Sequence, residues 1–100
     1  MKDIKTYTDK NILVLGLGKS GFAVSELLLK LGAKLTLNDK ADLDKNEKAQ
    51  ELKARGVRVI GGHHPVDLLE KEHFDYLVKN PGIPYENQMV QKAEELNIPI

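Results

Sequence analysis

The chain has 100 residues and a mass of 11.2 kDa, which is the size of a single domain. Hydrophobic residues make up 41% of it, enough to build a core, so a disordered tail or a low-complexity linker is excluded. Fifteen Lys and Arg balance fifteen Asp and Glu, so bulk positive charge cannot drive binding to nucleic acid or to an anionic membrane. We therefore expect neither as a partner.

The sequence contains no cysteine, which excludes disulfide bridges, thiolate metal sites and a cysteine nucleophile. Residues 1–10 mix Lys and Asp without an apolar stretch, unlike a secretory signal. No 18 apolar residues run together anywhere in the chain, as a membrane-spanning helix would require. These features predict a soluble domain, most simply a cytoplasmic one.

The first predicted element is a strand at residues 12–15, a continuous apolar run that stops at Gly16. Such a run is typical of a strand buried on both faces. A helix follows and ends at Gly32, because apolar residues recur at i, i+3, i+4 and i+7, namely Val24, Leu27, Leu28 and Leu31.

The alternation of strand and helix continues to the end of the chain. Further strands are predicted at residues 35–37, 57–60 and 76–78. Helices are predicted around Ala49 and Leu52, closed at Arg55 and Gly56, then at residues 66–71, and at residues 89–96, ended near Asn97. A fifth strand is expected to begin at residues 98–100.

Strands that recur about every 20 residues, each separated by a helix, predict βαβ units and a parallel sheet. The expected fold is therefore a three-layer α/β architecture, an open sheet of about five parallel strands with helices on both faces. Because the fifth strand is cut at Ile100, we expect residues 1–100 to be one domain excised from a longer protein.

A glycine-rich turn, Gly16-Leu17-Gly18-Lys19-Ser20-Gly21, stands between the first strand and the first helix. In a G-x-G-x-x-G turn, the first glycine permits the sharp bend, the second lets the backbone approach a ligand, and the third lets helix and strand pack closely. The turn aims free N–H groups and the positive end of the helix at one point, where a pyrophosphate would lie. Lys19 adds a cation and Ser20 adds a hydroxyl donor.

An acidic residue, Asp39, stands about 20 residues after this turn, at the end of the second predicted strand. That spacing is the one expected of a carboxylate that binds a ribose. The alternative is a glycine turn packed for structural reasons, with Asp39 capping the next segment. A Walker-type phosphate loop is excluded, because the glycine it needs five residues before Gly18 is Leu13. A carboxylate in such a loop buries little surface, so Asp39→Ala is expected to leave the melting temperature nearly unchanged.

The fourth predicted strand ends in a second candidate loop, Asn80-Pro81-Gly82-Ile83-Pro84. In an open parallel sheet, ligands lie beyond the carboxyl ends of the strands, so this loop should face the glycine turn. Pro81-Gly82 predicts a type II turn with the Gly82 N–H accessible, and the Asn80 amide can donate or accept. The alternative is only a sharp turn before the last helix.

Three histidines and several carboxylates remain, and none of them forms a recognisable catalytic set. His63 and His64 are adjacent and should point apart, and His73 is not at helical spacing from either, so we expect ordinary polar groups and no metal site. The predicted site binds a nucleotide that carries a pyrophosphate, and no catalytic residue is expected in this chain.

Three segments together resemble the N-terminal domain of the Mur ligase family. They are residues 11–21 with the glycine turn, residues 37–40, and residues 78–84 with the string Asn-Pro-Gly-Ile-Pro. The resemblance covers essentially the whole chain and is closest to the member that adds D-glutamate. It implies a Rossmann-like domain, the first of three, that holds the uridine diphosphate of UDP-N-acetylmuramoyl-L-alanine during peptidoglycan synthesis.

The same resemblance implies roles for the predicted residues and for parts of the enzyme outside this chain. The diphosphate and uridine would contact Gly18, Lys19 and Ser20, the uracil end Asp39 and Lys40, and the diphosphate also Asn80 and Gly82. ATP and Mg²⁺ would bind a central domain, so this domain would hold no cofactor or metal and would not be catalytic alone. A monomeric enzyme of cell wall biogenesis, cell shape and cell division is implied.

Two other functions fit the same residues. A domain that binds NAD(P) in a dehydrogenase or a regulator would also use the glycine turn and Asp39. A scaffold domain could keep the fold and bind nothing. Residues alone do not choose between a UDP-sugar and a dinucleotide, because both carry a pyrophosphate and a ribose.

Overall fold

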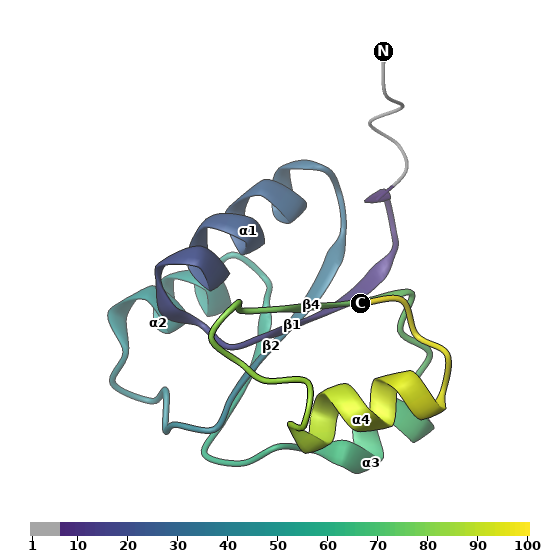
Figure 1. The fold of residues 1–100 in the computed structure, drawn as a ribbon. Coiled ribbons are helices and arrows are strands. Elements are labelled where there is room, and N and C mark those ends of the chain that lie inside the picture. Colours follow the sequence, from purple (N-terminus) through teal and green to yellow (C-terminus); the bar gives the residue numbers. More distant parts are fainter. Residues whose placement is uncertain (1–6) are drawn as a thin grey trace.

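The computed structural model describes residues 7–100; residues 1–6, part of the charged N-terminal stretch, lie outside the described residues. In this part of the chain, strands and helices alternate strictly (Figure 1). The strands are β1 (Asn11–Leu15), β2 (Lys34–Asp39), β3 (Arg58–Gly61) and β4 (Tyr76–Lys79), and the helices are α1 (Gly18–Lys30), α2 (Glu47–Ala54), α3 (Val66–Lys71) and α4 (Gln88–Glu95).

The four strands form one parallel sheet in the order β3-β2-β1-β4. β1 lies inside the sheet, where Leu15 is in register with Asn38 of β2 and with Lys79 of β4. The chain therefore winds outward from β1 in one direction to β3, and then crosses to the other side to form β4. The point at which the strand order reverses lies between β1 and β4, which is where such sheets bind ligands.

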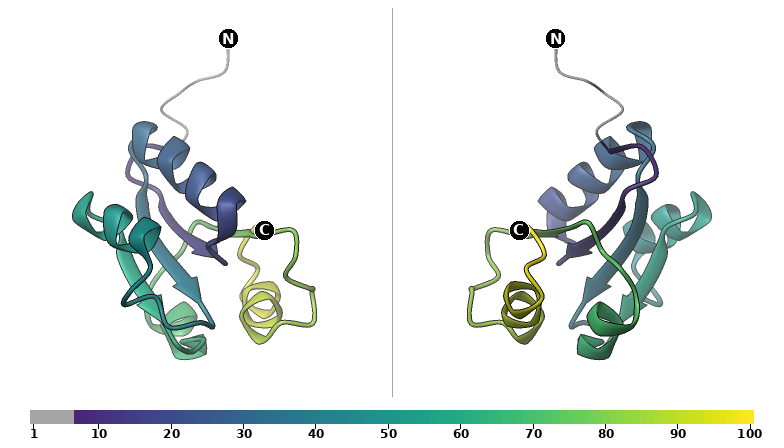
Figure 2. Two further views of the ribbon diagram at one scale, coloured as in Figure 1. Left: turned by 90° about the vertical axis from the view of Figure 1, so that its left-hand side faces the viewer. Right: turned by 90° about the vertical axis from the view of Figure 1, so that its right-hand side faces the viewer.

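Helices cover the two faces of the sheet, as Figures 1 and 2 show. On one face α1 and α2 pack over β1, β2 and β3, and on the other face α3 and α4 pack over β1 and β4. β1 contributes to both cores, because Ile12 and Val14 face α1 while Leu13 and Leu15 face α4. The predicted three-layer α/β fold, of the Rossmann-like type, is confirmed.

The helix ends follow the predicted residues. Gly32 and Gly56 have φ of +85° and +98° just beyond α1 and α2, and Asn97 has φ +58° beyond α4. These are the left-handed values that end helices, and glycine and asparagine adopt them at the least cost. The sequence therefore marked the C-terminal ends of these three helices correctly.

The predicted fifth strand is not formed. Residues 98–100 have no strand structure, and one backbone hydrogen bond of 2.8 Å, from the Leu77 N–H to the Pro99 carbonyl, joins them to β4. Pro99 has no N–H to donate, and a single bond does not make a ladder. The described sheet thus has four strands where about five were expected.

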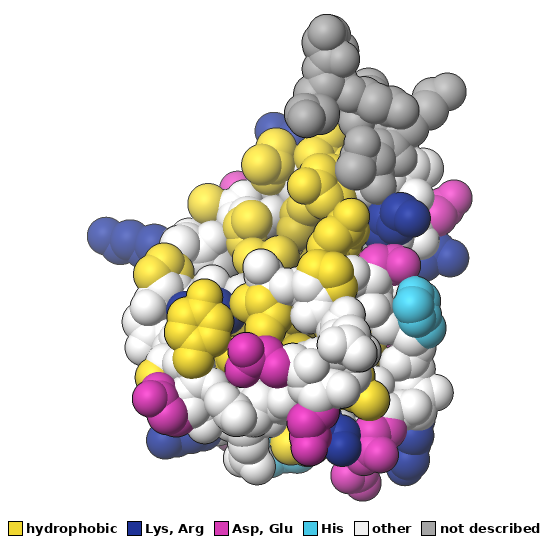
Figure 3. Space-filling model, turned by 45° about the vertical axis from the view of Figure 1, so that its right-hand side comes forward, with side chains coloured by type: hydrophobic (Ala, Val, Ile, Leu, Met, Phe, Trp, Pro, Cys, Tyr) yellow, Lys and Arg dark blue, Asp and Glu magenta, His cyan; other side chains and the backbone are white. Residues whose placement is uncertain are grey.

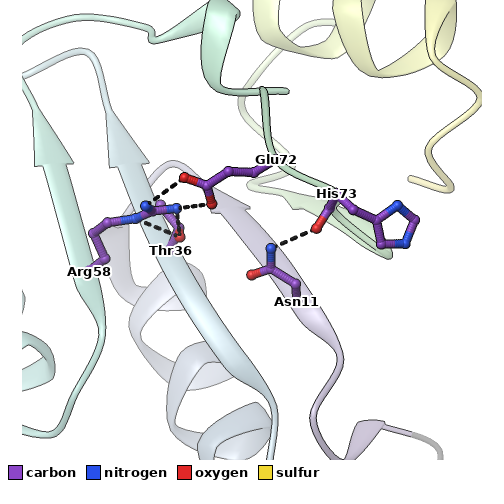
Figure 4. A network of polar contacts seen from close by, with 5 residues as sticks. All are labelled: Asn11, Thr36, Arg58, Glu72 and His73. Atoms are coloured by element: carbon purple, nitrogen blue, oxygen red, sulfur yellow. Dashed lines mark hydrogen bonds and ion pairs between the residues drawn. The ribbon is translucent and has the colours of Figure 1, made fainter. Parts of the chain in front are cut away.

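A polar network ties β2 and β3 to the segment before β4, at the end of the sheet away from the glycine turn (Figure 4). The Arg58 guanidinium donates to both carboxylate oxygens of Glu72, at 2.9 and 2.8 Å, and to the buried Thr36 hydroxyl. Because Arg58 donates hydrogen bonds to it, Glu72 has a pKa below the usual range of a carboxyl. Nearby, the Asn11 side chain donates to the His73 carbonyl at 2.7 Å.

The α1 side of β4 carries no further helix among the described residues, and a mostly apolar cavity of about 230 Å³ lies there. Its lining includes Val24 and Leu27 of α1, Tyr76 and Val78 of β4, and Ile100. Figure 3 shows apolar side chains gathered on the face turned toward the viewer. Within residues 7–100, none of the helices has the length and apolar character needed to cross a membrane.

Candidate ligand-binding site

A cavity of about 310 Å³ lies beyond the carboxyl ends of β1, β2 and β4. It opens at the point where the strand order reverses. Its lining residues come from the glycine turn, the end of β2, the loop after β3 and the loop after β4: Gly16, Leu17, Gly18, Asp39, Lys40, His64, Asn80, Gly82, Ile83, Pro84 and Asn87. The two loops singled out in the sequence therefore meet at one cavity.

The glycine turn presents backbone to the cavity. Gly16 has φ +90°, and a Cβ there would lie 2.6 Å from Ile83 Cδ1 and 2.9 Å from Asn80 Cβ, so its side-chain space is filled by the second loop. α1 begins at Gly18 with no side-chain cap and no acidic residue in its first turn. The first N–H groups of a helix have no partner within it and carry partial positive charge, so this end of α1 suits an anion.

Gly21 serves helix packing, as its place in the motif predicted. A Cβ on Gly21 would clash with the carbonyl oxygen of Gly16. The closeness of α1 to the end of β1 therefore depends on the absence of a side chain at this position. That closeness keeps the first turn of α1 directly behind the cavity.

Asp39 holds the glycine turn in place. Its Oδ2 accepts a hydrogen bond of 3.0 Å from the Leu17 N–H, and its Oδ1 accepts one of 2.9 Å from the Ala41 N–H. One carboxylate thus connects β1's turn with the start of the loop after β2. This is the capping role that the sequence left open as the alternative, and Asp39 also lines the cavity.

The loop after β4 differs from its predicted geometry. The Ile83 N–H donates to the Asn80 carbonyl at 2.9 Å, which closes the turn, but Gly82 lacks the positive φ that a type II turn requires. The Gly82 N–H is not free either, because it donates to Asn80 Oδ1 at 3.0 Å. Asn80 uses its oxygen within the loop and turns Nδ2 toward Gly18, where it lies 3.0 Å from the position of an added Cβ.

The predicted site residues divide into two groups. Five of them line the cavity, namely Gly18, Asp39, Lys40, Asn80 and Gly82. Lys19 and Ser20 do not line it and are exposed on the first turn of α1. Ser20 instead lines a smaller cavity of about 200 Å³ on the α1 side of Asn80. The G-x-G-x-x-G pattern does not specify where the side chains between its glycines point. For this reason the prediction placed Lys19 and Ser20 at the ligand together with Gly18.

Sequence reasoning missed two residues of the cavity, His64 and Asn87. His64 Nδ1 lies 2.7 Å from Oδ1 of the buried Asn38, and His64 Nε2 lies 3.2 Å from Asn87 Nδ2. From the sequence alone, His64 is expected to be an ordinary polar residue of a loop. The available signal was topological, since the loop after β3 leaves the same edge of the sheet as the glycine turn.

The pKa of His64 lies below the usual range of histidine. Removal of the ring from water is the main cause, and the charges of Lys40 and His63 act in the same direction, while the Asp39 carboxylate opposes them. Desolvation disfavours the charged imidazolium. The neutral form of the ring is therefore favoured over the imidazolium.

The site offers hydrogen-bond donors and one cation, and no set of groups for catalysis stands out. Free backbone N–H groups of α1, Asn80 Nδ2 and the Lys40 ammonium suit an anion, and Ile83 and Pro84 add apolar surface. Among the described residues, no three His, Asp or Glu side chains are grouped so as to hold a metal ion. The arrangement is that of a binding site for an anionic ligand with an apolar part.

Comparison with solved structures supports the fold. The PH0520 protein from Pyrococcus horikoshii OT3 is 26% identical with a TM-score of 0.58, and the alignment covers 86% of this chain and 23% of that protein. A lactate dehydrogenase from Eimeria maxima, solved with NADH and oxamate, is 22% identical with a TM-score of 0.55, covering 90% of this chain and 29% of that one. The second similarity is one of fold alone.

Comparison with curated proteins gives much closer relatives. Proteins named UDP-N-acetylmuramoylalanine--D-glutamate ligase are 95% identical in Lactobacillus helveticus, 91% in Lactobacillus acidophilus and 59% in Lacticaseibacillus casei, each over all 100 residues. The chain spans 22% of the length of these relatives. It is therefore similar to one part of each of them.

The family itself is established by a match that covers most of the chain. Residues 10–100 match the model of a family described as Mur ligase MurD-like, N-terminal domain. The resemblance noted from the glycine turn and the Asn-Pro-Gly-Ile-Pro loop is thereby confirmed. The chain belongs to the MurD-like Mur ligase N-terminal domain family.

Proposed function

We propose that this chain is the domain that binds the UDP part of UDP-N-acetylmuramoyl-L-alanine in a ligase that adds D-glutamate to that substrate during peptidoglycan synthesis. The observation that carries the proposal is the convergence of the glycine turn, Lys40 and Asn80 on one cavity at the reversal point of the sheet. The names of the relatives with 95% and 91% identity support the choice of reaction.

The diphosphate is the part of the ligand that the glycine turn and Asn80 suit best. Two phosphates carry two negative charges, and the first turn of α1 supplies free N–H groups and the positive end of the helix dipole. Asn80 Nδ2 faces Gly18 and remains a donor, because Asn80 Oδ1 is the atom that accepts from Gly82. Backbone and amide donors hold a diphosphate by hydrogen bonds of fixed direction.

The uridine suits the other half of the cavity. Asp39 and Lys40 lie at the end of β2, and Ile83 and Pro84 give apolar surface against which a pyrimidine can pack. The Asp39 oxygens already accept from Leu17 and Ala41. We therefore assign Asp39 the task of holding the turn, with its remaining acceptor capacity available to the nucleoside.

The proposed domain binds and orients the substrate, and the reaction takes place elsewhere in the ligase. The full enzyme activates the carboxylate of the substrate as an acyl phosphate, and the amine of D-glutamate attacks it to form an amide and release phosphate. ATP and Mg²⁺ are held by parts of the enzyme outside residues 1–100, so this domain alone is not catalytic. We further propose a cytoplasmic, monomeric enzyme with no nucleic-acid or membrane partner, in line with the balanced charge.

Calorimetric titration tests the proposal. UDP-N-acetylmuramoyl-L-alanine is titrated into the 100-residue chain and, in parallel, into the full-length ligase, with UDP, NADH and GDP as comparison ligands. We expect the UDP ligands to bind and NADH and GDP not to bind. Binding of NADH alone would support a dehydrogenase-type domain, and binding of none of these to either protein would favour a scaffold.

A further inference from the structure

The donor and acceptor roles of Asn38 follow from its surroundings. Asn38 is fully buried at the end of β2, and its Nδ2 lies 2.8 Å from the carbonyl oxygens of both Ile60 and His63. Carbonyl oxygens only accept, so the Asn38 NH₂ group must face them. The Asn38 Oδ1 therefore faces His64 Nδ1 at 2.7 Å, and that ring nitrogen must carry a proton.

The roles of Asn87 follow in the same way from the other side of the ring. Asn87 is the N-cap of α4, where its Oδ1 accepts a hydrogen bond of 2.8 Å from the Met89 N–H. Its Nδ2 is then the donor that lies 3.2 Å from His64 Nε2. Because the amide NH₂ can only donate, Nε2 must be unprotonated. The ring is fixed as the neutral form with its proton on Nδ1.

We propose that His64 is a positioning residue of the ligand cavity, which joins the loop after β3 to the start of α4 only while its ring is neutral and protonated on Nδ1. Both His64 and Asn87 line the cavity, and the loop that leads to Asn87 carries Ile83 and Pro84 of the same lining. The bridge from Asn38 through His64 to Asn87 thus sets the distance between two walls of the site. The ligand side of this inference rests on the proposed function.

Protonation of His64 opposes the bridge directly. A proton on Nε2 would point at the Asn87 NH₂ group, so the hydrogen bond would be replaced by two donors facing each other. The charged groups that act on the ring are Asp39 and Lys40 from the end of β2 and His63 from its own loop; the group facing it from α4 is the neutral Asn87. The bridge should therefore be intact at neutral pH and be lost as the pH falls.

Nuclear magnetic resonance of the chain labelled with ¹⁵N-histidine tests the assignment without any ligand. At pH 7.5, His64 should show Nδ1 as the protonated nitrogen and Nε2 as the free one. His63, whose ring is exposed, serves as an internal comparison. A His64 ring protonated on Nε2, or one that averages between the two forms, would overturn the proposal.

Asn87→Asp is a second test that keeps the cap of α4, because aspartate is as good an N-cap as asparagine. Its carboxylate can accept from a protonated His64, so the variant should raise the pKa of His64 relative to that of the parent chain. A His64 titration that is the same in both proteins would show that the two side chains are not in contact, and would contradict the bridge.

The pH dependence of affinity connects the bridge to the ligand. UDP-N-acetylmuramoyl-L-alanine keeps its diphosphate and carboxylate ionised from pH 7.5 to 5.5. A change in affinity over this range therefore reflects protonation of the protein and not of the ligand. We expect affinity for it to fall about fivefold over this range, the equivalent of one lost hydrogen bond, and to fall less in Asn87→Asp. An affinity that rises on acidification would show that imidazolium attracts the diphosphate, and would overturn the proposed role.

Failure of this inference and failure of the proposed function give different results. If UDP ligands bind with the same affinity at every pH, the function stands and the positioning role of His64 falls. If no UDP ligand binds at any pH, the proposed function falls, and the role of His64 toward the ligand falls with it. The tautomer and the His64 titration then still decide whether the bridge itself exists.

Discussion

The carboxylate of Asp39 accepts a hydrogen bond from the backbone N–H of Leu17 at 3.0 Å, so the end of β2 holds the glycine turn that follows β1. The second oxygen of the same carboxylate accepts from the Ala41 N–H. Asp39 therefore shapes the wall of the cavity that it lines. A residue with this position acts on the ligand partly through the backbone that it fixes.

Replacement of Asp39 should lower stability, which differs from the expectation for an acidic residue in a loop. Asp39→Ala leaves the part-buried Leu17 N–H without its acceptor, whereas the exposed Ala41 N–H can donate to water, and the variant should cost about 1–3 kcal/mol in the free energy of unfolding. Asp39→Asn keeps one oxygen acceptor and should cost less. Urea denaturation measures both changes. A change below about 0.5 kcal/mol for Asp39→Ala, typical of neutral surface substitutions, would contradict the role of Asp39 in holding the glycine turn.

Two glycines of the turn should respond differently to an added methyl group. In Gly21→Ala the Cβ meets the Gly16 carbonyl, a backbone atom that cannot move aside, so stability should fall by about 1–3 kcal/mol. In Gly18→Ala the Cβ meets the Asn80 Nδ2 at 3.0 Å, and the φ of +49° at this position adds backbone strain for any residue other than glycine. We therefore expect both variants to lose stability, and Gly18→Ala in addition to weaken UDP binding, because only its Cβ enters the cavity beside Asn80 Nδ2.

The comparison of the two variants by thermal denaturation and by titration with UDP separates packing from binding. A Gly21→Ala variant as stable as the parent would contradict the close packing of α1 on the end of β1. An unchanged UDP affinity in a folded Gly18→Ala would remove Asn80 Nδ2 from the ligand's contacts.

Two lysines of the predicted site form a matched pair for a test of charge. Lys40 lines the cavity, whereas Lys19 is exposed on α1 and does not. Lys40→Met should lower the affinity for UDP about tenfold, as expected for loss of a hydrogen bond to a charged group, and Lys19→Met about twofold or less, as for an exposed pair. Titrations at two salt concentrations measure this, and equal effects would show that general charge attraction dominates.

Acid should weaken the fold through Glu72. Arg58 lowers the pKa of Glu72 from its ordinary value of 4.5, so the folded chain binds this proton less readily than the unfolded chain does. The stabilisation is therefore complete above pH 4.5 and is lost as the pH falls from there through the lowered pKa. Glu72→Gln and Arg58→Met should each make the loss of stability shallower below this pH.

Urea denaturation between pH 7 and pH 3 measures how steeply the free energy of unfolding falls with pH in the parent, in Glu72→Gln and in Arg58→Met. Both variants should also be less stable than the parent at pH 7, because Arg58 then lacks its carboxylate or Glu72 its guanidinium. If the slope below pH 4.5 is the same in all three, the ion pair does not contribute to acid unfolding, and other carboxylates must account for it.

The fold could be predicted because each element carries its own period and its own stop signal. The buried run at residues 12–15 and the stripe from Val24 to Leu31 are local patterns, and Gly32, Gly56 and Asn97 have the φ values that their residue types favour. The fifth strand was the exception. An apolar triplet predicts burial, but whether residues 98–100 pair with β4 depends on backbone groups that the pattern does not describe, and Pro99 supplies no N–H.

The position of the site could be predicted from the topology of the sheet, but its detailed hydrogen bonds could not. The reversal of strand order brings the glycine turn and the Asn80 loop together, as the βαβ pattern requires. The prediction of a type II turn with a free Gly82 N–H was wrong. A Pro-Gly pair fits more than one type of turn, and the Gly82 N–H donates to the Asn80 side chain. His64 and Asn87 were missed because their roles depend on partners more than 20 residues away in the chain.

The placement of β1 has a consequence for how the binding site opens. This strand lies inside the sheet, with Ile12, Leu13 and Leu15 fully buried, so its amides should exchange with solvent deuterium only when the whole domain unfolds. The rim residues Lys40 and Gly82 are exposed and should exchange by small local openings. The site thus combines a rigid strand, β1, with exposed residues that open locally. A bound nucleotide should slow amide exchange at Lys40 and Gly82 and leave the exchange of β1 as slow as before.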